Sequence, residues 1–339
     1  MQIHTILLFA GLLAVAMLHS HGQAEEPLRA GIIGCDTSHV IAFTKVLNDP
    51  KATGPFAEVQ IVAAYPGGSD DIPSSYERVD KYSDELRGMG VTIVPSIDAL
   101  LEQVDVVLVE SVDGRPHLEQ VRPVLAAGKR VFIDKPMAGS LADAVEIDQL
   151  AKTHGVPWFS SSSLRFSPGI LGMRNDPRVG DVVGCAAYSP CSLEPHHPDL
   201  FWYGIHGVET LFTIMGTGCE SVTRVHTDGT DLAVGIWEGG RVGTFRGIRS
   251  GAKGYGATVF GSKGILPSGP YAGYKPLVVE IVRFFQTGKS PVSAEETIEI
   301  LAFMEAADES RRNGGLPVRI ETVLKKARAE VAARTGAEK

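Results

Sequence analysis

Between residues 30 and 160, short apolar runs alternate with longer stretches in which apolar residues recur at helical spacing. The runs are rich in β-branched residues and stay apolar at consecutive positions, which is typical of strands covered on both faces. This alternation predicts a parallel, doubly wound α/β sheet. We expect its strands at 30–33, 59–65, 91–94, 104–109, 131–133 and 158–160, and its helices at 40–47, 76–89, 97–102, 117–127 and 141–154.

The second half of the chain follows a different pattern. With 339 residues, the chain is too long for one comfortable core, so a second domain is expected there. Short strand-like runs separated by glycine-rich turns predict strands at 182–188, 222–228, 232–237, 242–249 and 257–260. Helical patterns follow at 277–286 and 294–312.

The chain opens with an uninterrupted apolar run at residues 6–18, and residues 1–24 contain no Lys, Arg, Asp or Glu. A run of thirteen residues is too short to span a bilayer but suits the apolar region of a secretory signal peptide. Gly22-Gln23-Ala24 offers small residues for cleavage, so we expect a periplasmic or secreted protein. The segment before the run has no basic residue, which leaves an N-terminal membrane anchor as the alternative.

Composition narrows the function classes. The net charge is −8 and no basic cluster occurs, which argues against a nucleic-acid partner. Four cysteines exclude a disulfide scaffold and show no Cys-x-x-Cys zinc spacing. Export would permit a bond between Cys185 and Cys191, but their spacing does not decide whether one forms.

Ligands of a doubly wound sheet bind at the carboxyl ends of its strands, so the residues after each strand carry the chemistry. After the first strand stands Gly34-Cys35-Asp36-Thr37-Ser38-His39, where a dinucleotide-binding turn has the pattern G-x-G-x-x-G. Gly34 fits the first position, whereas Asp36 and His39 replace the second and third glycines. The acidic residue that would hold a ribose after the second strand is also missing. A helix-capping turn that binds no phosphate is therefore as good an interpretation as a cofactor site.

Two later segments resemble a known family. AGKRVFIDKPMA at 127–138 resembles the Glu-Lys-Pro segment of the Gfo/Idh/MocA oxidoreductases, with Asp134 in place of the glutamate. GIHGVETL at 204–211 resembles the family's G-x-H-x-x-D helix, with Glu209 in place of the aspartate. The resemblance spans residues 28–325 and includes Arg165-Phe166, and the glycine turn is the element that departs from it.

The resemblance implies the domain organisation. We expect a signal peptide at 1–24, a Rossmann-type dinucleotide-binding domain at 25–163, an α/β domain with an open, mostly antiparallel sheet at 164–325, and a tail at 326–339. It also implies an oxidoreductase that uses NAD or NADP, held tightly, and acts on a sugar, polyol or sugar derivative. Since open sheets in this family commonly pair between subunits, a homo-oligomer is expected as well.

The resemblance and the residue chemistry together indicate the site. Lys135 and His206 are the candidate acid–base groups, and Glu209, on the same helix face as His206, would orient the imidazole or bind a sugar hydroxyl. Pro136 allows a cis bond beside Lys135. The candidate cofactor-binding residues are Gly34, Asp36, Thr37, Ser38, His39, Ser111, Asp113, Arg115, His117, Asp134 and Lys135. The candidate substrate-binding residues are Arg165, His196, His197, Asp199, Trp202 and Tyr203.

Other interpretations stay open. The chain could be a keto-sugar lyase, hydrolase or epimerase of the same fold, or a non-catalytic carbohydrate-binding protein. Free NAD is scarce outside the cytoplasm, which weighs against a dissociable cofactor in an exported enzyme. A divalent metal could bind His196, His197, Asp199 and His206, but adjacent histidines seldom ligate one ion, so we expect no metal.

We predict that the mature chain begins at Glu25, because Ala24 ends the small-residue cleavage site. N-terminal sequencing of the protein recovered from its native envelope checks this. An intact Met1 in a membrane fraction would show that the segment is an anchor instead.

Overall fold

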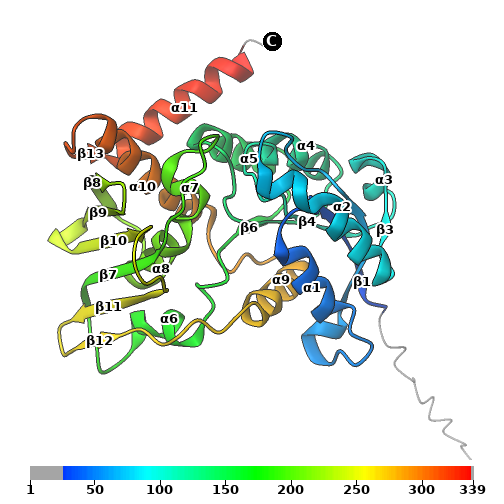
Figure 1. Cartoon of the computed structure of the whole chain (residues 1–339), viewed down its shortest axis with the longest axis horizontal. Helices are drawn as coiled ribbons and strands as arrows, with labels where there is room; N and C mark the ends of the chain where they lie inside the picture. Colours follow the sequence, from blue (N-terminus) through cyan, green and yellow to red (C-terminus); the bar gives the residue numbers. More distant parts are fainter. Residues whose placement is uncertain (1–25, 337–339) are drawn as a thin grey trace, which may run out of the picture.

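The first domain is built on a six-stranded parallel sheet in the order β3-β2-β1-β4-β5-β6 (Figure 1). The computed structural model describes residues 26–336, so the expected signal peptide lies outside the described residues. The strand order reverses between β1 and β4, and ligands of doubly wound sheets bind beside such a switch point. The strands are β1 (Leu28–Ile33), β2 (Val59–Tyr65), β3 (Thr92–Ile93), β4 (Val106–Val109), β5 (Val131–Ile133) and β6 (Trp158–Ser160), which confirms the predicted strands.

Helices cover both faces of this sheet, as its consecutive apolar positions require. The residues of the two faces belong to two separate hydrophobic clusters, one containing Val40 and Phe43 of α1 and the other Val121 of α4 and Ile147 of α5. Ser96 and Ser140 cap α3 and α5 by accepting a hydrogen bond from a first-turn N–H. The helices are α1 (Ser38–Leu47), α2 (Pro73–Gly88), α3 (Ile97–Leu101), α4 (His117–Ala126) and α5 (Leu141–His154), with a short 3₁₀ turn η1 (Gly54–Ala57).

The chain returns to this first domain late in the sequence. Helix α9 (Lys275–Thr287) packs into the same hydrophobic cluster as α1, and Phe284 lies against Phe159 with ring centroids 5.0 Å apart. The expected division into contiguous domains at 163/164 is therefore wrong for this helix. Its apolar residues show helical spacing in the sequence, but nothing in that spacing tells which sheet the helix covers.

The second domain contains a seven-stranded sheet in the order β12-β11-β7-β10-β9-β8-β13. It is mostly antiparallel, as expected, and β7 and β10 are its parallel pair. The edge strands β12 and β13, of three and two residues, are too short for the sequence pattern to predict. The strands are β7 (Val182–Pro190), β8 (Cys219–Thr227), β9 (Thr230–Trp237), β10 (Val242–Ile248), β11 (Gly256–Gly261), β12 (Ile265–Pro267) and β13 (Val318–Arg319).

Helices α8 (Ile205–Met215) and α10 (Ala294–Arg312) pack on one face of this sheet, against β7 and β8. The opposite face carries exposed apolar side chains on several strands, among them Val183, Tyr188, Val225 and Ile236. Four short elements complete the chain: α6 (Pro168–Leu171) and η2 (Gly172–Asn175) precede β7, α7 (Asp199–Trp202) precedes α8, and η3 (Glu238–Gly240) joins β9 to β10.

The C-terminal residues form a helix and not a tail. Helix α11 (Ile320–Gly336) buries Val323, Ala327 and Val331, which are spaced four residues apart, and Arg334 pairs with Asp143 of α5 at 2.6 Å. A four-residue spacing of apolar residues predicts a helix, so the expected tail at 326–339 was wrong for residues 326–336. Within residues 26–336, no helix is long and apolar enough to cross a membrane.

The cysteines of the described chain are free thiols, so the structure contains no bond between Cys185 and Cys191. Both are buried, and burial raises the pKa of each thiol to about 12. They therefore behave as small apolar side chains of the second domain.

A buried arginine joins three elements of the second domain. The Arg224 side chain on β8 is fully buried, and its Nε donates to Asp231 Oδ1 at 2.8 Å. Its two other nitrogens donate to Asp308 of α10 and, at 3.0 Å, to Asp199 of α7. Asp199 also pairs with Arg311, so this expected substrate-binding residue is engaged in holding the second domain together.

We predict that Arg224→Met lowers the free energy of unfolding by about 3–5 kcal/mol, because it leaves buried carboxylates without their cation. Urea denaturation followed by circular dichroism measures the change. Arg178→Met is the matched control, since the Arg178 side chain is 73% exposed and its pair with Asp176 should contribute little. Equal midpoints for the two variants would contradict the prediction.

Candidate active site

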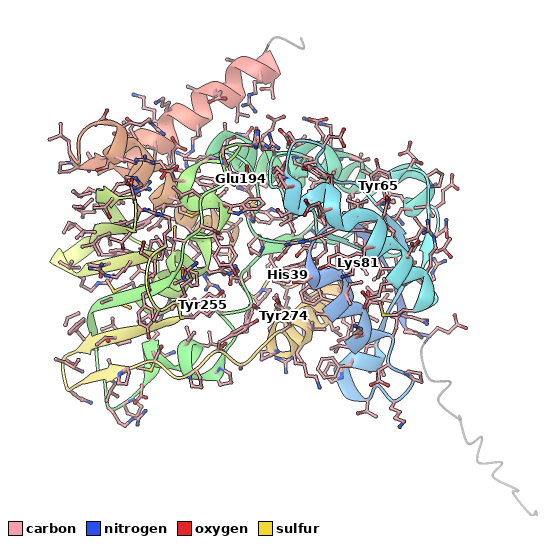
Figure 2. The ribbon with its side chains drawn as sticks, viewed as in Figure 1. His39, Tyr65, Lys81, Glu194, Tyr255 and Tyr274 are labelled. Atoms are coloured by element: carbon pink, nitrogen blue, oxygen red, sulfur yellow. The ribbon has the colours of Figure 1, made fainter. Side chains whose placement is uncertain are left out.

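A cavity of about 290 Å³ lies between the two domains, at the carboxyl ends of the parallel strands. It is at the small end of the range for ligand pockets, about 300–1,000 Å³, and so suits a monosaccharide-sized molecule. His39, Tyr255 and Tyr274 face this region in the middle of the molecule (Figure 2). The lining residues are Thr37, Ser38, His39, Arg78, Val112, Lys135, Ser163, Leu164, Tyr203, His206, Tyr255, Tyr271 and Tyr274.

Lys135 lines this cavity from the first domain. It follows β5 directly, and its peptide bond to Pro136 is cis, as the sequence allowed. The residue is only 7% exposed, and its Nζ lies 4.0 Å from Asp134 Oδ2. An amine in this position can exchange a proton with a hydroxyl or carbonyl oxygen of a bound molecule.

His206 lines the same cavity from the second domain. It is the second residue of α8, and its Nδ1 lies 2.7 Å from Ser162 Oγ in the loop after β6. Burial, together with the nearby Lys135 and His39, holds the pKa of His206 well below its ordinary value. The imidazole is therefore neutral at neutral pH and can accept a proton.

Glu209 does not contact the His206 ring, so the expectation that it orients the imidazole directly is wrong. Its carboxylate accepts hydrogen bonds from Ser161 Oγ at 2.5 Å, Ser162 N–H at 2.8 Å and Arg165 Nε at 2.7 Å. Glu209 reaches His206 only through Ser162.

Arg165 also lies away from the cavity. It is 5% exposed, and its Nη1 donates to Glu296 at 2.9 Å in addition to the bond with Glu209. The three side chains form a closed ion network, so the structure gives Arg165 no access to a substrate in the cavity.

Four tyrosines surround the space between Lys135 and His206. The hydroxyls of Tyr203 and Tyr255 lie 3.1 Å apart, and that of Tyr271 lies 2.9 Å from Ser163 Oγ. Burial raises the pKa of Tyr271 to about 12, so its hydroxyl stays protonated. Of the four, only Tyr203 was expected; the others lie in loops far along the chain, where no spacing links them to the site.

The turn after β1 has the conformation of a dinucleotide-binding turn only at its first residue. Gly34 has φ +92°, and a Cβ there would lie 2.4 Å from Ser111 N, so this position requires glycine. At the second position, the fully buried Asp36 accepts hydrogen bonds from Ser75 Oγ at 2.6 Å and Val112 N–H at 2.9 Å. Its carboxylate thus joins the turn to α2 and to the loop after β4.

The loop after β2 lies directly on this turn. The N–H groups of Gly34 and Cys35 donate to Tyr65 O and Pro66 O at 2.9 and 2.6 Å. A Cβ added to Gly67 would lie 3.2 Å from the Cα of Gly34. Backbone groups that a pyrophosphate could have used are therefore bonded to the protein itself.

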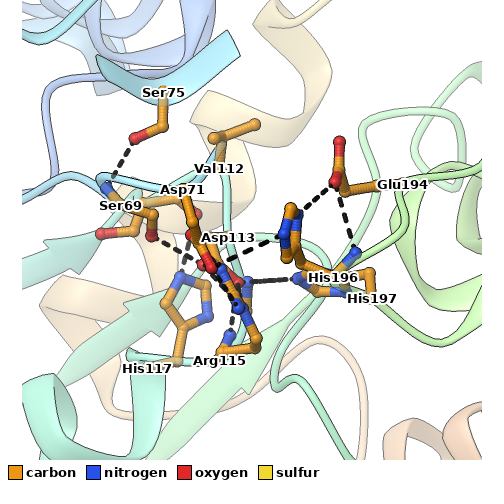
Figure 3. A network of polar contacts seen from close by, with 12 residues as sticks. Ser69, Asp71, Ser75, Val112, Asp113, Arg115, His117, Glu194, His196 and His197 are labelled. Carbon is orange, nitrogen blue, oxygen red and sulfur yellow. Dashed lines mark hydrogen bonds and ion pairs between the residues drawn. The ribbon is translucent and has the colours of Figure 1, made fainter. Parts of the chain in front are cut away.

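A polar network fastens the same loop to both domains (Figure 3). Asp113 accepts hydrogen bonds from Ser69 Oγ at 2.6 Å and from Arg115, and its Oδ1 lies 2.8 Å from His197 Nε2 of the second domain. Burial alone would raise the pKa of Asp113, but these bonds outweigh it and hold the pKa well below the ordinary value. Asp71 extends the network through Arg115, with a 2.7 Å contact.

The remaining expected residues serve this network or the core. Both ring nitrogens of His117 face backbone carbonyls, Ser111 O at 2.9 Å and Met137 O at 3.1 Å, so this buried side chain holds loops together. Ser111 Oγ pairs with Gln120. His196 is exposed and bonds Glu194 at 2.8 Å, and Trp202 packs against the His197 ring. None of these side chains lines the cavity.

The metal alternative does not fit the geometry. His197 pairs with Asp113, Asp199 with Arg224 and Arg311, and His206 with Ser162. These donors face different partners and do not converge within the part of the chain that the structure describes.

Comparisons with known proteins agree with this fold. Residues 28–161 match the model of the oxidoreductase family with an NAD-binding Rossmann fold, Gfo/Idh/MocA. 1,5-Anhydro-D-fructose reductase of Ensifer adhaerens is 28% identical over 238 residues, which cover 65% of each chain. The chain thus spans less than two thirds of the length of this relative, and 41% and 38% of two uncharacterised oxidoreductases from Streptococcus pneumoniae and Escherichia coli.

Solved structures show the same fold over nearly the whole chain. Scyllo-inositol dehydrogenase of Lactobacillus casei, with bound NAD(H) and scyllo-inositol, superposes with a TM-score of 0.70 at 15% identity, covering 87% of this chain and 99% of that one. Myo-inositol 2-dehydrogenase of Lactobacillus plantarum gives 0.70 at 16% identity, covering 86% and 99%. The match to the Gfo/Idh/MocA oxidoreductase family thus covers the N-terminal domain, residues 28–161.

The family implies a nicotinamide dinucleotide, and the residues present fit only part of one. The N-terminal turn of α1, with Thr37, Ser38 and the side chain of Arg78, lines the cavity and can accept a phosphate. The ribose of the adenosine half would lie beside the end of β2, where the loop held by Asp36 and Asp113 covers the turn. A whole dinucleotide therefore requires this loop to move.

We predict that Asp36→Gly strengthens NADH binding at least tenfold, because it removes a buried carboxylate and its bonds to Val112 and to Ser75, which itself holds Ser69 of the covering loop. A fluorescence titration with NADH measures the affinity. Asp36→Asn keeps the size but loses the charge, so it should give a smaller gain. Equal affinities of Asp36→Gly and the unchanged protein would show that this loop does not limit binding.

Proposed function

We propose that the protein is an oxidoreductase that transfers hydride between a nicotinamide nucleotide and a hydroxyl-bearing carbon of a sugar, polyol or sugar derivative. The observation that carries the proposal is the convergence of Lys135 and His206 on one cavity from two domains. The family of the N-terminal domain and the reductase and dehydrogenase names of its relatives support it.

The chain's own residues would divide the work as follows. A bound nicotinamide would supply the hydride acceptor or donor. Lys135 Nζ would take the proton of the reacting hydroxyl as it becomes a carbonyl, or return it in reduction. His206, kept neutral by burial, would accept a hydrogen bond or a proton from the same or the adjacent hydroxyl.

The lining favours a polyhydroxylated substrate. Tyrosine hydroxyls and Ser163 supply several donors and acceptors within a few ångströms, and the tyrosine rings offer apolar faces to a sugar ring. The small volume of the cavity favours one sugar unit over an oligosaccharide.

A second function is favoured by one observation. The loop bonded to Asp113 and, through Ser75, to Asp36 covers the place of the adenosine half, so a keto-sugar lyase, hydrolase or epimerase that uses no dissociable cofactor also fits. A purely carbohydrate-binding role is less well supported, because it leaves the burial of Lys135 beside Asp134 without a purpose.

Location and assembly complete the proposal. The apolar segment at 6–18 supports export to the periplasm or beyond. The exposed apolar side chains on the open face of the second sheet support pairing of two such faces in a homo-oligomer.

The first test is chemical. Denaturing the purified protein and analysing the released small molecules, together with titration by NAD and NADP, decides whether a nicotinamide nucleotide binds. If no nucleotide is released and neither NAD nor NADP binds, the oxidoreductase proposal is wrong and the cofactor-independent one is favoured.

We predict that Lys135→Ala lowers kcat by about 100-fold or more on the substrate found by screening sugars, keto-sugars and polyols, the usual loss for a general acid–base group. Lys135→Arg should not restore it, because a guanidinium stays protonated. Lys152→Ala, on the exposed side of α5, is the control with unchanged turnover. Near-normal turnover of Lys135→Ala would remove this residue from the mechanism.

A further inference from the structure

The residue at the third glycine position of the turn forms a second buried pair in the cavity. His39 is the second residue of α1 and is 6% exposed, and its Nδ1 lies 2.7 Å from Asp134 Oδ2. Its ring stacks on Phe43, with centroids 5.4 Å apart, and meets the edge of Tyr274 at 4.8 Å. Phe43 and Tyr274 thus hold the ring in place with Nδ1 toward Asp134, and the residue lines the cavity.

Asp134 determines which nitrogen of His39 carries the proton. Burial would raise the pKa of Asp134, but His39 and Lys135 outweigh burial and hold the pKa below the ordinary value. An ionised carboxylate can only accept, so Nδ1 donates to Asp134, and in the neutral ring the lone pair is on Nε2. This arrangement leaves a basic nitrogen at the cavity wall.

A second carboxyl group lies behind the pair. Glu110, at the end of β4, is fully buried, and its Oε2 lies 3.9 Å from His39 Nδ1. Neither of its oxygens has a hydrogen-bond partner among the described residues. Burial and the adjacent Asp134 raise the pKa of Glu110 well above its ordinary value, whereas Asp134, whose pKa is lowered, is the carboxylate that bonds His39.

Oxidation of an alcohol needs one proton acceptor, and the cavity is lined by three side chains that can accept a proton. Lys135, His206 and His39 all line this cavity of about 290 Å³. A base facing a cation is the arrangement that removes a proton from a carbon next to a carbonyl, since the cation stabilises the enolate oxygen.

We propose that His39 is a second catalytic base, which removes the proton from a carbon next to the carbonyl of a keto-sugar bound against Lys135. The C–H bond breaks, its proton becomes the Nε2–H of His39, and its electron pair forms the enediolate, whose oxygen faces the Lys135 ammonium. Return of a proton to the same carbon regenerates the keto-sugar, so no oxidant or reductant is needed. Asp134 is the positioning residue that fixes the ring and stabilises the imidazolium.

The experiment is solvent deuterium exchange without nicotinamide. The full mature protein in D₂O, with 1,5-anhydro-D-fructose as the probe, should incorporate deuterium next to the carbonyl faster than a protein-free control, as followed by proton NMR. The exchange needs no NAD, so a negative result here can be distinguished from a failure of the protein to bind NAD or to oxidise a substrate. No exchange above the control would overturn the inference.

Variants identify the base. His39→Gln and Asp134→Asn should each lower the exchange rate by about 100-fold or more. Imidazole added to His39→Ala should restore part of the rate, which a structural histidine would not allow. Glu110→Gln should cost less than Asp134→Asn, because Glu110 Oε2 lies 3.9 Å from His39 Nδ1 and does not bond it. His196→Gln, at an exposed histidine outside the cavity, is the matched control.

Two results would contradict the assignment. Near-normal exchange by His39→Gln, with an unchanged melting temperature, would remove His39 from the chemistry. The ligand atoms of His39, Glu110 and Asp134 lie within 4.8 Å of one another, so a chelator is included. If EDTA abolishes the exchange and Mn²⁺ or Zn²⁺ restores it, these residues bind a metal ion and His39 is not the base.

Discussion

One buried carboxylate joins the two domains beside the cavity. Glu209 belongs to α8 of the second domain, yet its bonds go to Ser161, Ser162 and Arg165 in the loop that leaves the first sheet. A buried carboxylate is costly unless it is fully bonded, so this loop cannot slide along α8 without exposing an unpaired charge. Because His206 lies on the same helix and bonds Ser162, the constraint that joins the domains also sets the imidazole opposite Lys135.

The sequence predicted the helices and strands well, but it said less about which segments contact one another between the two domains. Consecutive apolar positions predicted every strand of the first sheet, because strands covered on both faces leave that pattern. Helix α9 returns to the first domain because it covers apolar residues of the first sheet. The spacing of apolar residues in the sequence does not show which sheet a helix covers. Lys135 and His206 could be predicted because each belongs to a recognisable sequence motif. The other lining residues come together only in the folded chain, among them Arg78, Tyr255, Tyr271 and Tyr274.

The polar residues between 34 and 209 illustrate the same limit. Their types suggested ligand contacts, but burial assigns many of them to the protein itself: Asp36 to Ser75, Asp113 to His197, and Glu209 to Arg165. A side chain that can bind a sugar or a phosphate can equally satisfy a buried N–H or guanidinium. Residue type therefore indicates the chemistry available, and only the structure tells which partner uses it.

The two departures from the glycine turn have a common physical consequence. Glycines at these positions allow a pyrophosphate to approach the backbone and the helix to pack on the strand. Asp36 instead fills the turn with a carboxylate bonded to α2 and β4, and His39 places an imidazole between Phe43 and Tyr274. The first change reduces the room for a dinucleotide, and the second adds a base on the wall shared with Lys135. Where the dinucleotide-binding pattern has glycines, this turn therefore carries one carboxylate that holds its neighbours and one imidazole that lines the cavity.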